Sequence, residues 1–275
     1  MRRIFTLTRY FLRSFFWSLT GLLYLILALV YWNVFFNPSQ GTPEIENYIL
    51  IIGVFGAAVS FLVALSIASR ANQAVHLPLV IRLASRVEYL TAVLFSTILA
   101  ATLLQLLVAA LAMFRGPGLL WGRLLEIPPL WLATNVLAAV VALHASDFVA
   151  VGWSRVTLFG ILGLLLIGKS ADDRISSWLV TRLNSWSITA NGQGWQVLAD
   201  WMRSAGVWLN GRETGFLSQL YSWIIWPFTA ISDAVINGFF TAPQALAPAV
   251  ILLYAAILFL LSAELFAEKD LEFVE

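Results

Sequence analysis

The sequence predicts an all-α polytopic membrane protein with about six transmembrane helices. Of its 275 residues, 60% are hydrophobic and only 11% are charged, whereas soluble domains carry about 25% charged residues. Several uncharged apolar runs have the length that a helix needs to cross the hydrocarbon core of a bilayer. Because polar and apolar residues do not alternate along these runs, the runs favour helices over the strands of a membrane barrel.

The composition excludes several kinds of functional site. The chain has no cysteine, which excludes disulfides, thiolate catalysis and cysteine-based metal sites. His76 and His144 are its only histidines, too few for a haem or zinc cluster without other ligands, so no cofactor and no metal are expected. The net charge of +1 gives no indication of a nucleic-acid partner. A membrane-embedded enzyme is the least supported class, because the sequence offers no Ser/His/Asp set and no paired carboxylates.

Residues 1–14 have an amphipathic pattern. On a helix with about 100° per residue, Arg2, Arg9 and Arg13 fall within ~40° of one another, with Phe11 and Phe15 on the opposite side. This pattern predicts an interfacial helix whose arginines face lipid phosphates. The alternative is a positively charged flank that only orients the first span, and the two interpretations are compatible.

The predicted spans are separated by loops that differ in charge. The spans are residues 15–36, 48–68, 88–114, 129–149, 156–168 and 245–266. Basic residues gather in the short segments that a six-span chain places on one side: Arg2, Arg3, Arg9, Arg13, Arg70, Arg82, Arg86, Arg155 and Lys269. Such segments mark the cytosolic face of a membrane protein. Six spans therefore predict that both termini are cytosolic.

Residues 169–240 interrupt the regular succession of spans. The part from 169 to 215 is polar and rich in tryptophan, which favours the lipid–water boundary, so we expect short amphipathic helices at about 175–183 and 195–209 on the outer surface. The part from 216 to 240 is apolar but contains Pro227, Asp233 and Gly238. If it crosses the membrane, the chain has seven spans and an external C-terminus.

The loop 69–88 is a polar, basic break between two long apolar runs. It contains three arginines but only one acid, Glu88. After Pro78 the spacing fits a short helix, with Arg82 and Arg86 four residues apart on one side. A short amphipathic helix under the membrane indicates a docking surface for a soluble protein. The alternative is an ordinary basic loop that follows the positive-inside rule.

The string Ala84-Ser85-Arg86-Val87-Glu88 resembles the P-x-S-R-x-E signal of ABC-2 type permeases, the membrane subunits of type V ABC exporters. In that family the signal follows the coupling helix, and the third span begins at the acid. Ala84 stands where the family often has Pro. The layout of spans extends the likeness to most of the chain, although segment 169–215 is longer than in a minimal permease.

The resemblance implies a single permease domain over residues 1–275. It would contain an elbow helix at 1–14, a coupling loop at 69–88 and an external, re-entrant segment at 169–240. The domain would lack its own ATPase site and would work with a cytosolic ATPase and a second permease copy in a prokaryotic inner membrane. The residues expected to contact the ATPase are Leu77, Leu79, Val80, Arg82, Arg86 and Glu88. The alternative is a non-transporting scaffold or accessory subunit of a larger membrane complex, with the tryptophan-rich segment as its docking face.

Three other patterns have simpler explanations. Residues 163–170 match the P-loop pattern by chance, because four bulky apolar residues stand where a phosphate cradle needs a flexible loop. His144 and Asp147 share a helix face; a proton relay is one interpretation, and bonding to a neighbouring helix is the favoured one. Gln105 and Asn135 are expected to link helices by hydrogen bonds.

Overall fold

The computed structural model describes residues 2–36, 45–83, 85–113, 121–149, 159–160, 180–210, 216–237 and 241–268. Within these ranges every regular element is helical and no β-strand occurs, which confirms the predicted all-α class. The chain divides into two compact units. Unit 1 comprises Met1–Arg155 and Pro227–Glu275, and unit 2 comprises Val156–Trp226.

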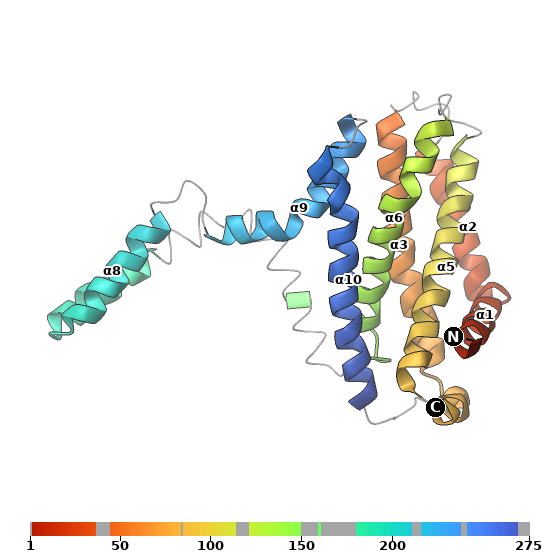
Figure 1. The fold of residues 1–275 in the computed structure, drawn as a ribbon, viewed down its shortest axis with the longest axis horizontal. Helices are drawn as coiled ribbons and strands as arrows, with labels where there is room; N and C mark the ends of the chain where they lie inside the picture. Colours follow the sequence, from red (N-terminus) through yellow and green to blue (C-terminus); the bar gives the residue numbers. More distant parts are fainter. Residues whose placement is uncertain are drawn as a thin grey trace. The chain divides into compact units, whose positions relative to one another are not determined.

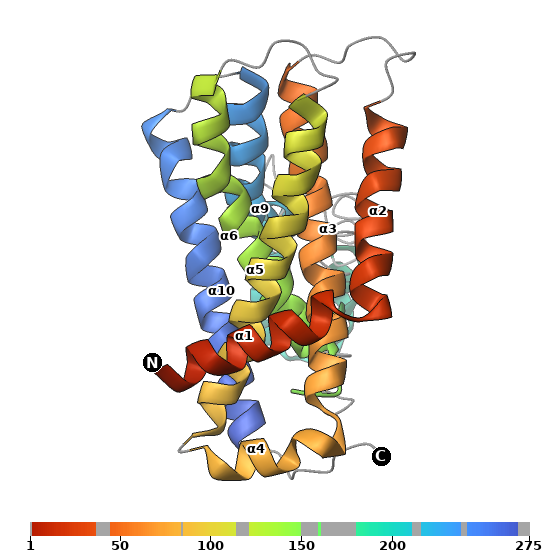
Figure 2. The ribbon, with the colours of Figure 1, turned by 90° about the vertical axis from the view of Figure 1, so that its right-hand side faces the viewer.

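Unit 1 is a bundle of long helices that run side by side (Figures 1 and 2). Its main helices are α1 (Arg2–Phe16), α2 (Leu19–Phe35), α3 (Ile45–Ala71), α5 (Arg86–Met113), α6 (Trp121–Ala145) and α10 (Ala242–Glu268). Helix α3 packs against both α5 and α6, α10 packs against α6, and α1 packs across α5. Helices α2, α3, α5 and α10 are apolar on all sides, as expected of helices that are surrounded by lipid and by one another.

Three helical segments in the described residues are long and apolar enough to cross a membrane: Ile49–Ala71, Arg86–Met113 and Ala242–Glu268. The bent pair α1 and α2 makes a fourth candidate. These helices coincide with predicted spans one, two, three and six. The apolar part of α6 is the shorter segment Trp131–Ala145, and predicted span five lies outside the described residues except for 159–160. The structure thus supports a membrane protein with three or four spans in its described part.

Helices α3 and α5 are longer than a bilayer core is thick. They contain 27 and 28 residues, which at about 1.5 Å per residue gives each a length of roughly 40 Å. The hydrocarbon core measures about 30 Å. A helix of this length that runs along the bilayer normal projects beyond the core. Arg70 lies at the C-terminal end of α3 and Arg86 opens α5, so the segment that joins them belongs to the charged end of the bundle.

A bend of 70° separates α1 from α2. Ser18 caps α2, because its Oγ accepts a hydrogen bond from the Gly21 N–H at 3.3 Å. The same hydroxyl donates to the Phe15 carbonyl at 2.6 Å. A side chain at position 21 would collide with that carbonyl, so glycine permits the close approach of the two helices.

Helix α1 has the amphipathic character that the sequence predicts. Thr8, Phe11 and Phe15 are buried in the bundle, and Phe11 packs edge-on against Tyr89 of α5 with ring centroids 5.5 Å apart. The exposed side of α1 carries four arginines, Arg2, Arg3, Arg9 and Arg13. Figure 2 shows α1 lying across the bundle rather than along it.

A buried polar link joins three helices in the middle of the bundle. The Asn135 Nδ2 of α6 donates to the Gln105 Oε1 of α5 at 2.6 Å. The Gln105 Nε2 in turn donates to the Ile52 carbonyl of α3 at 3.0 Å. Both polar side chains are almost fully buried. The prediction that Gln105 and Asn135 link helices is confirmed.

Gly56→Ala is expected to lower the stability of the bundle by about 1–3 kcal/mol. An added Cβ would overlap the Gln105 amide, so that side chain would have to leave its two partners. The measurement is the thermal unfolding midpoint in detergent. Gly192→Ala is the matched control, because nothing lies within 4 Å of a Cβ at that position. Equal midpoints for the two variants would contradict the polar link.

Unit 2 contains a helix over 180–192 and helix α8 (Gln196–Asn210). Helix α8 agrees with the prediction for 195–209, whereas the earlier helix extends beyond the predicted end at 183 and its predicted start lies outside the described residues. Helix α9 (Phe216–Asn237) contains Pro227, and the boundary between the two units falls at this proline. A proline inside a helix removes one backbone hydrogen bond and favours a kink.

Candidate functional site

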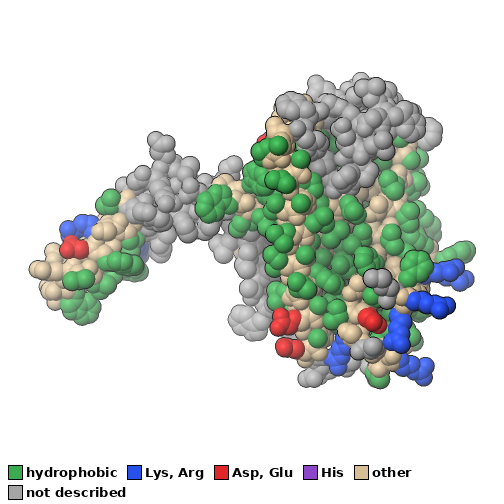
Figure 3. Space-filling model, in the orientation of Figure 1, with side chains coloured by type: hydrophobic (Ala, Val, Ile, Leu, Met, Phe, Trp, Pro, Cys, Tyr) green, Lys and Arg blue, Asp and Glu red, His purple; other side chains and the backbone are tan. Residues whose placement is uncertain are grey.

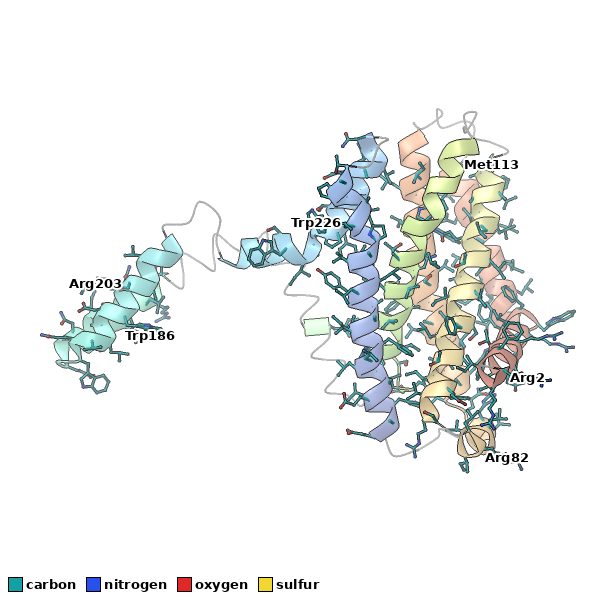
Figure 4. All side chains as sticks on the ribbon, in the orientation of Figure 1. Arg2, Arg82, Met113, Trp186, Arg203 and Trp226 are labelled. Carbon is teal, nitrogen blue, oxygen red and sulfur yellow. The ribbon has the colours of Figure 1, made fainter. Side chains whose placement is uncertain are left out.

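Most of the arginines in the described part of the bundle gather at one end, which we term the arginine-rich end. Seven arginines form this group: Arg2, Arg3, Arg9, Arg13, Arg70, Arg82 and Arg86. Arg123, in the first turn of α6, does not belong to it. Figure 3 shows basic side chains projecting from this end, with acidic side chains nearby. In Figure 4, Arg2 and Arg82 lie at the end of the bundle opposite Met113. The charges of the bundle are therefore distributed asymmetrically along its axis.

Two short helices form the connection between α3 and α5. The 3-10 helix η1 (Ala74–His76) leads directly into α4 (Leu77–Arg82), which lies across the arginine-rich end (Figure 2). Pro78 stands at the start of α4, where a missing backbone N–H removes no helical hydrogen bond. The backbone becomes extended at Leu83 and ends the helix. The helix predicted after Pro78 is confirmed.

The outer side of α4 combines apolar and basic side chains. Leu79 is 38% exposed and Ile81 is 68% exposed, and Arg82 is also exposed. Ile81 was not among the predicted contact residues, although its place beside Arg82 in an amphipathic helix could have indicated it. These three residues, which we term the α4 surface, are available to another protein.

The other predicted contact residues have different surroundings. Val80 is buried in the core of the bundle, with 3% exposure. The Arg86 Nη1 donates to the Ala267 carbonyl near the end of α10 at 3.1 Å. Glu88 is half-buried in the first turn of α5, where a carboxylate is favoured by the helix dipole. Leu77 opens α4, and its side chain lies outside the described residues. The structure therefore does not bring the predicted residues together on one surface.

Arg70 connects the end of α3 to the bend between α1 and α2. Its Nη1 donates to the Ser14 carbonyl at 2.9 Å. Its Nη2 donates to both the Ser18 Oγ and the Thr20 Oγ1, each at 2.7 Å. In the sequence, Arg70 is one of several arginines in a basic loop. The pair of hydroxyl residues at the start of an apolar run, Ser18 and Thr20, could have indicated its partners.

His76 joins α4 to α1. It is buried, its Nε2 lies 3.3 Å from the Tyr10 Oη, and its ring lies 5.8 Å from that of Phe11. Close by, the Tyr89 hydroxyl of α5 donates to the Ala71 carbonyl at the end of α3 at 2.9 Å. A displacement of η1, which leads into α4, is therefore opposed by its contacts with α1.

The stability of the protein is expected to fall as the pH drops below about 6.5, in part because of His76. Burial lowers the pKa of His76 from its ordinary value of 6.5, and a backbone contact with Arg70 acts in the opposite direction. As the pH falls, the unfolded chain therefore binds a proton at this histidine before the folded chain does. The contribution of neutral His76 to the free energy of unfolding is present above pH 6.5 and is lost as the pH falls through the folded-state pKa. The measurement is the unfolding midpoint from pH 8 to pH 5, in wild type and His76→Phe. The variant should show a flatter profile; identical profiles would contradict the assignment.

A cleft of about 690 Å³ opens at the arginine-rich end. Its walls come from the end of α3, from η1 with the residues around it, and from the residues around the end of α6. The polar residues that line it are Ser69, Asn72, Gln73, Ser146 and Asp147.

His144 is buried, and its Nε2 lies 2.8 Å from the Leu258 carbonyl and 2.7 Å from the Ser262 Oγ of α10. Bonding to a neighbouring helix is thus confirmed for His144.

No protein-family model, curated protein or solved structure matches the chain. The class defined by the fold is an all-helical protein with three or four helices able to cross a membrane in its described part. Within that part, no group of three or more histidine or acidic side chains could hold a metal ion. Membership of the ABC-2 family stays a prediction from the sequence.

Proposed function

We propose that the chain is the permease subunit of an ABC-2 type exporter, which couples ATP hydrolysis by a separate ATPase to movement of a substrate across the membrane. The observation that carries this proposal is the α4 surface. Leu79, Ile81 and Arg82 lie on a short helix between two helices that are longer than a bilayer core is thick. An apolar anchor beside a positive charge suits a cleft with an acidic rim on a soluble partner.

The contacts of α4 explain how the ATPase could act on the spans. Val80 is held in the core of the bundle, and His76 contacts α1 through Tyr10. Arg86, at the start of α5, is bonded to α10. Under this proposal, a force applied to Leu79 or Arg82 would reach the core through Val80 and α1 through His76, which directly precedes α4. Under this proposal the closing of the ATPases on ATP would move α3 and α5 relative to α10.

The elbow and re-entrant elements of the permease belong to the same proposal. The bend of 70° between α1 and α2 and the exposed arginines of α1 support an elbow helix in the interface. Pro227 favours a kink before the last span, but α9 is one continuous helix from Phe216 to Asn237, so the predicted break into two half-helices is not seen there. Only 22% of the apolar window of α10 is buried, which leaves room for a second permease copy, with the substrate path between the copies.

The proposal fixes the topology. The chain is expected in a prokaryotic inner membrane, with both termini in the cytosol and residues 169–215 outside. No lysine or arginine occurs between Arg13 and Arg70, and the segments that are rich in basic residues stay in the cytosol. The measurement is the activity of reporter enzymes fused after Glu275 and within 169–215. A reporter that is active outside the cell when fused after Glu275 would indicate seven spans and contradict the ABC-2 proposal.

The second candidate function is a scaffold or accessory subunit of a larger membrane complex. For this function the docking face would be the surface of unit 2 that carries exposed tryptophans, among them Trp186 and Trp201, because tryptophan also occurs at the centre of protein interfaces. Co-expression with a candidate ABC ATPase from the same genome separates the two functions. A permease forms a complex whose ATP hydrolysis depends on this chain, whereas a scaffold does not.

A further inference from the structure

Unit 2 contains a helical hairpin, formed by 180–192 and α8 and here termed the hairpin. Its turn is closed by the Trp195 N–H, which donates to the Ala190 carbonyl at 2.9 Å, and by Gly194, whose φ of 82° favours glycine. The buried residues between the two helices are small: Ser187, Ala190, Ala199 and Gly206. A Cβ on Gly206 would lie 3.3 Å from the Asn184 Oδ1. The helices therefore meet through small side chains in close contact.

The large apolar side chains of the hairpin lie outside this contact. The exposed ones are Trp186, Ile188, Trp195, Val197, Leu198, Trp201 and Val207. On α8, Val197, Leu198 and Trp201 fall within an arc of about 100°, with Asp200 and Arg203 on another side. Asp200 and Arg203 pair with each other at 3.7 Å. Among the described residues of unit 2, nothing covers this apolar side of α8.

We infer that the hairpin is a membrane-surface element, which inserts the apolar arc of Val197, Leu198 and Trp201 into the interface of the lipid bilayer. The rest of the chain attaches the hairpin to the membrane, because α9 and the apolar helix α10 follow it in the sequence. Burial of such an arc to a depth of roughly 5–10 Å is typical of interfacial helices. The inference does not depend on the transport function.

Two observations favour lipid over a protein as the occupant. The first is the residue type, because Trp186, Trp195 and Trp201 present amphipathic rings of the kind that gather at the lipid–water boundary. The second is the charge. The described charges of the hairpin are Arg182, Asp200 and Arg203, and the Asp200–Arg203 pairing leaves little net charge to select a charged partner. We therefore expect the hairpin to bind neutral and anionic bilayers equally well.

The absence of cysteine from the chain allows each site to be labelled alone. Leu198→Cys and Val207→Cys form a matched pair, because both side chains are exposed and nine residues on a helix place them on opposite sides. Each variant of the full chain is labelled with a nitroxide and reconstituted into vesicles of phosphatidylcholine, with or without phosphatidylglycerol. Electron paramagnetic resonance then measures collisions of the label with oxygen, which concentrates in lipid, and with a water-soluble nickel complex. Variants are compared only where their gel-filtration profiles match the wild type.

The expected ratio of oxygen to nickel collisions is severalfold higher at position 198 than at position 207, in both kinds of vesicle. Equal ratios with free access of nickel would place the arc in water and overturn the inference. Low collision rates with both reagents at position 198 would mean that protein covers the arc, which also overturns it. Trp201→Cys repeats the measurement at a second position of the arc. If these collision ratios overturn the inference about the hairpin, the ATPase-coupling proposal is not affected, because that proposal concerns unit 1.

Discussion

Leu79→Asp is expected to abolish co-purification of the ATPase subunit while the bundle stays folded. Leu79 is 38% exposed on α4, so a carboxylate there meets water in the free protein but an apolar cleft in the complex. A buried apolar anchor contributes about 2 kcal/mol or more to binding, which corresponds to a roughly 30-fold loss of affinity. The measurement is the amount of tagged ATPase recovered with each variant, together with ATP hydrolysis by the complex.

Two further substitutions on α4 serve as controls. Val80→Asp is expected to prevent folding, because Val80 is only 3% exposed and a buried unpaired carboxylate is strongly destabilising. Arg82→Ala should weaken association less than Leu79→Asp and mainly at low salt, because rim charges steer association. If Leu79→Asp recovers as much ATPase as wild type, or if no ATPase accompanies the native protein, the coupling function is wrong and the scaffold function is favoured.

Arg70→Ala is expected to lower the free energy of unfolding by about 3 kcal/mol, since hydrogen bonds to charged groups contribute about 1.5–3 kcal/mol each and this arginine is partly exposed. The guanidinium donates to Ser14, Ser18 and Thr20, and its loss leaves the bend between α1 and α2 attached to α3 by fewer contacts. Arg70→Lys should not restore stability, because one ammonium group cannot reproduce the fork of a guanidinium. The measurement is thermal or denaturant unfolding in detergent.

Arg82→Ala is the matched control for this second prediction. Both residues are arginines near the same end of the bundle, but the Arg82 side chain is exposed on α4. A surface charge of this kind contributes little to stability. If the two alanine variants shift the unfolding midpoint equally, the hydrogen bonds of Arg70 do not stabilise the bend. Arg82→Ala should instead reduce ATPase association, so the two variants separate stability from coupling.

Several elements of the fold follow from the sequence alone, because each depends on a local pattern. The apolar run 88–114 predicted a span that the structure places at Arg86–Met113, since the length of an uncharged run limits where a helix can lie in a bilayer. The arginine periodicity of the first residues predicted the amphipathic helix α1. Pro78 predicted the start of the short helix α4.

The role of each arginine and of each α4 side chain was decided only by the tertiary structure. Arg70, Arg82 and Arg86 belong to one basic loop in the sequence, yet Arg70 binds residues about 50 positions earlier and Arg86 binds Ala267. Val80 is buried and Ile81 is exposed, although both are β-branched apolar neighbours. A local pattern gives the residue type and the helix, but hydrogen-bond acceptors and packing partners come from distant segments. Burial and pairing therefore arise only when those segments meet.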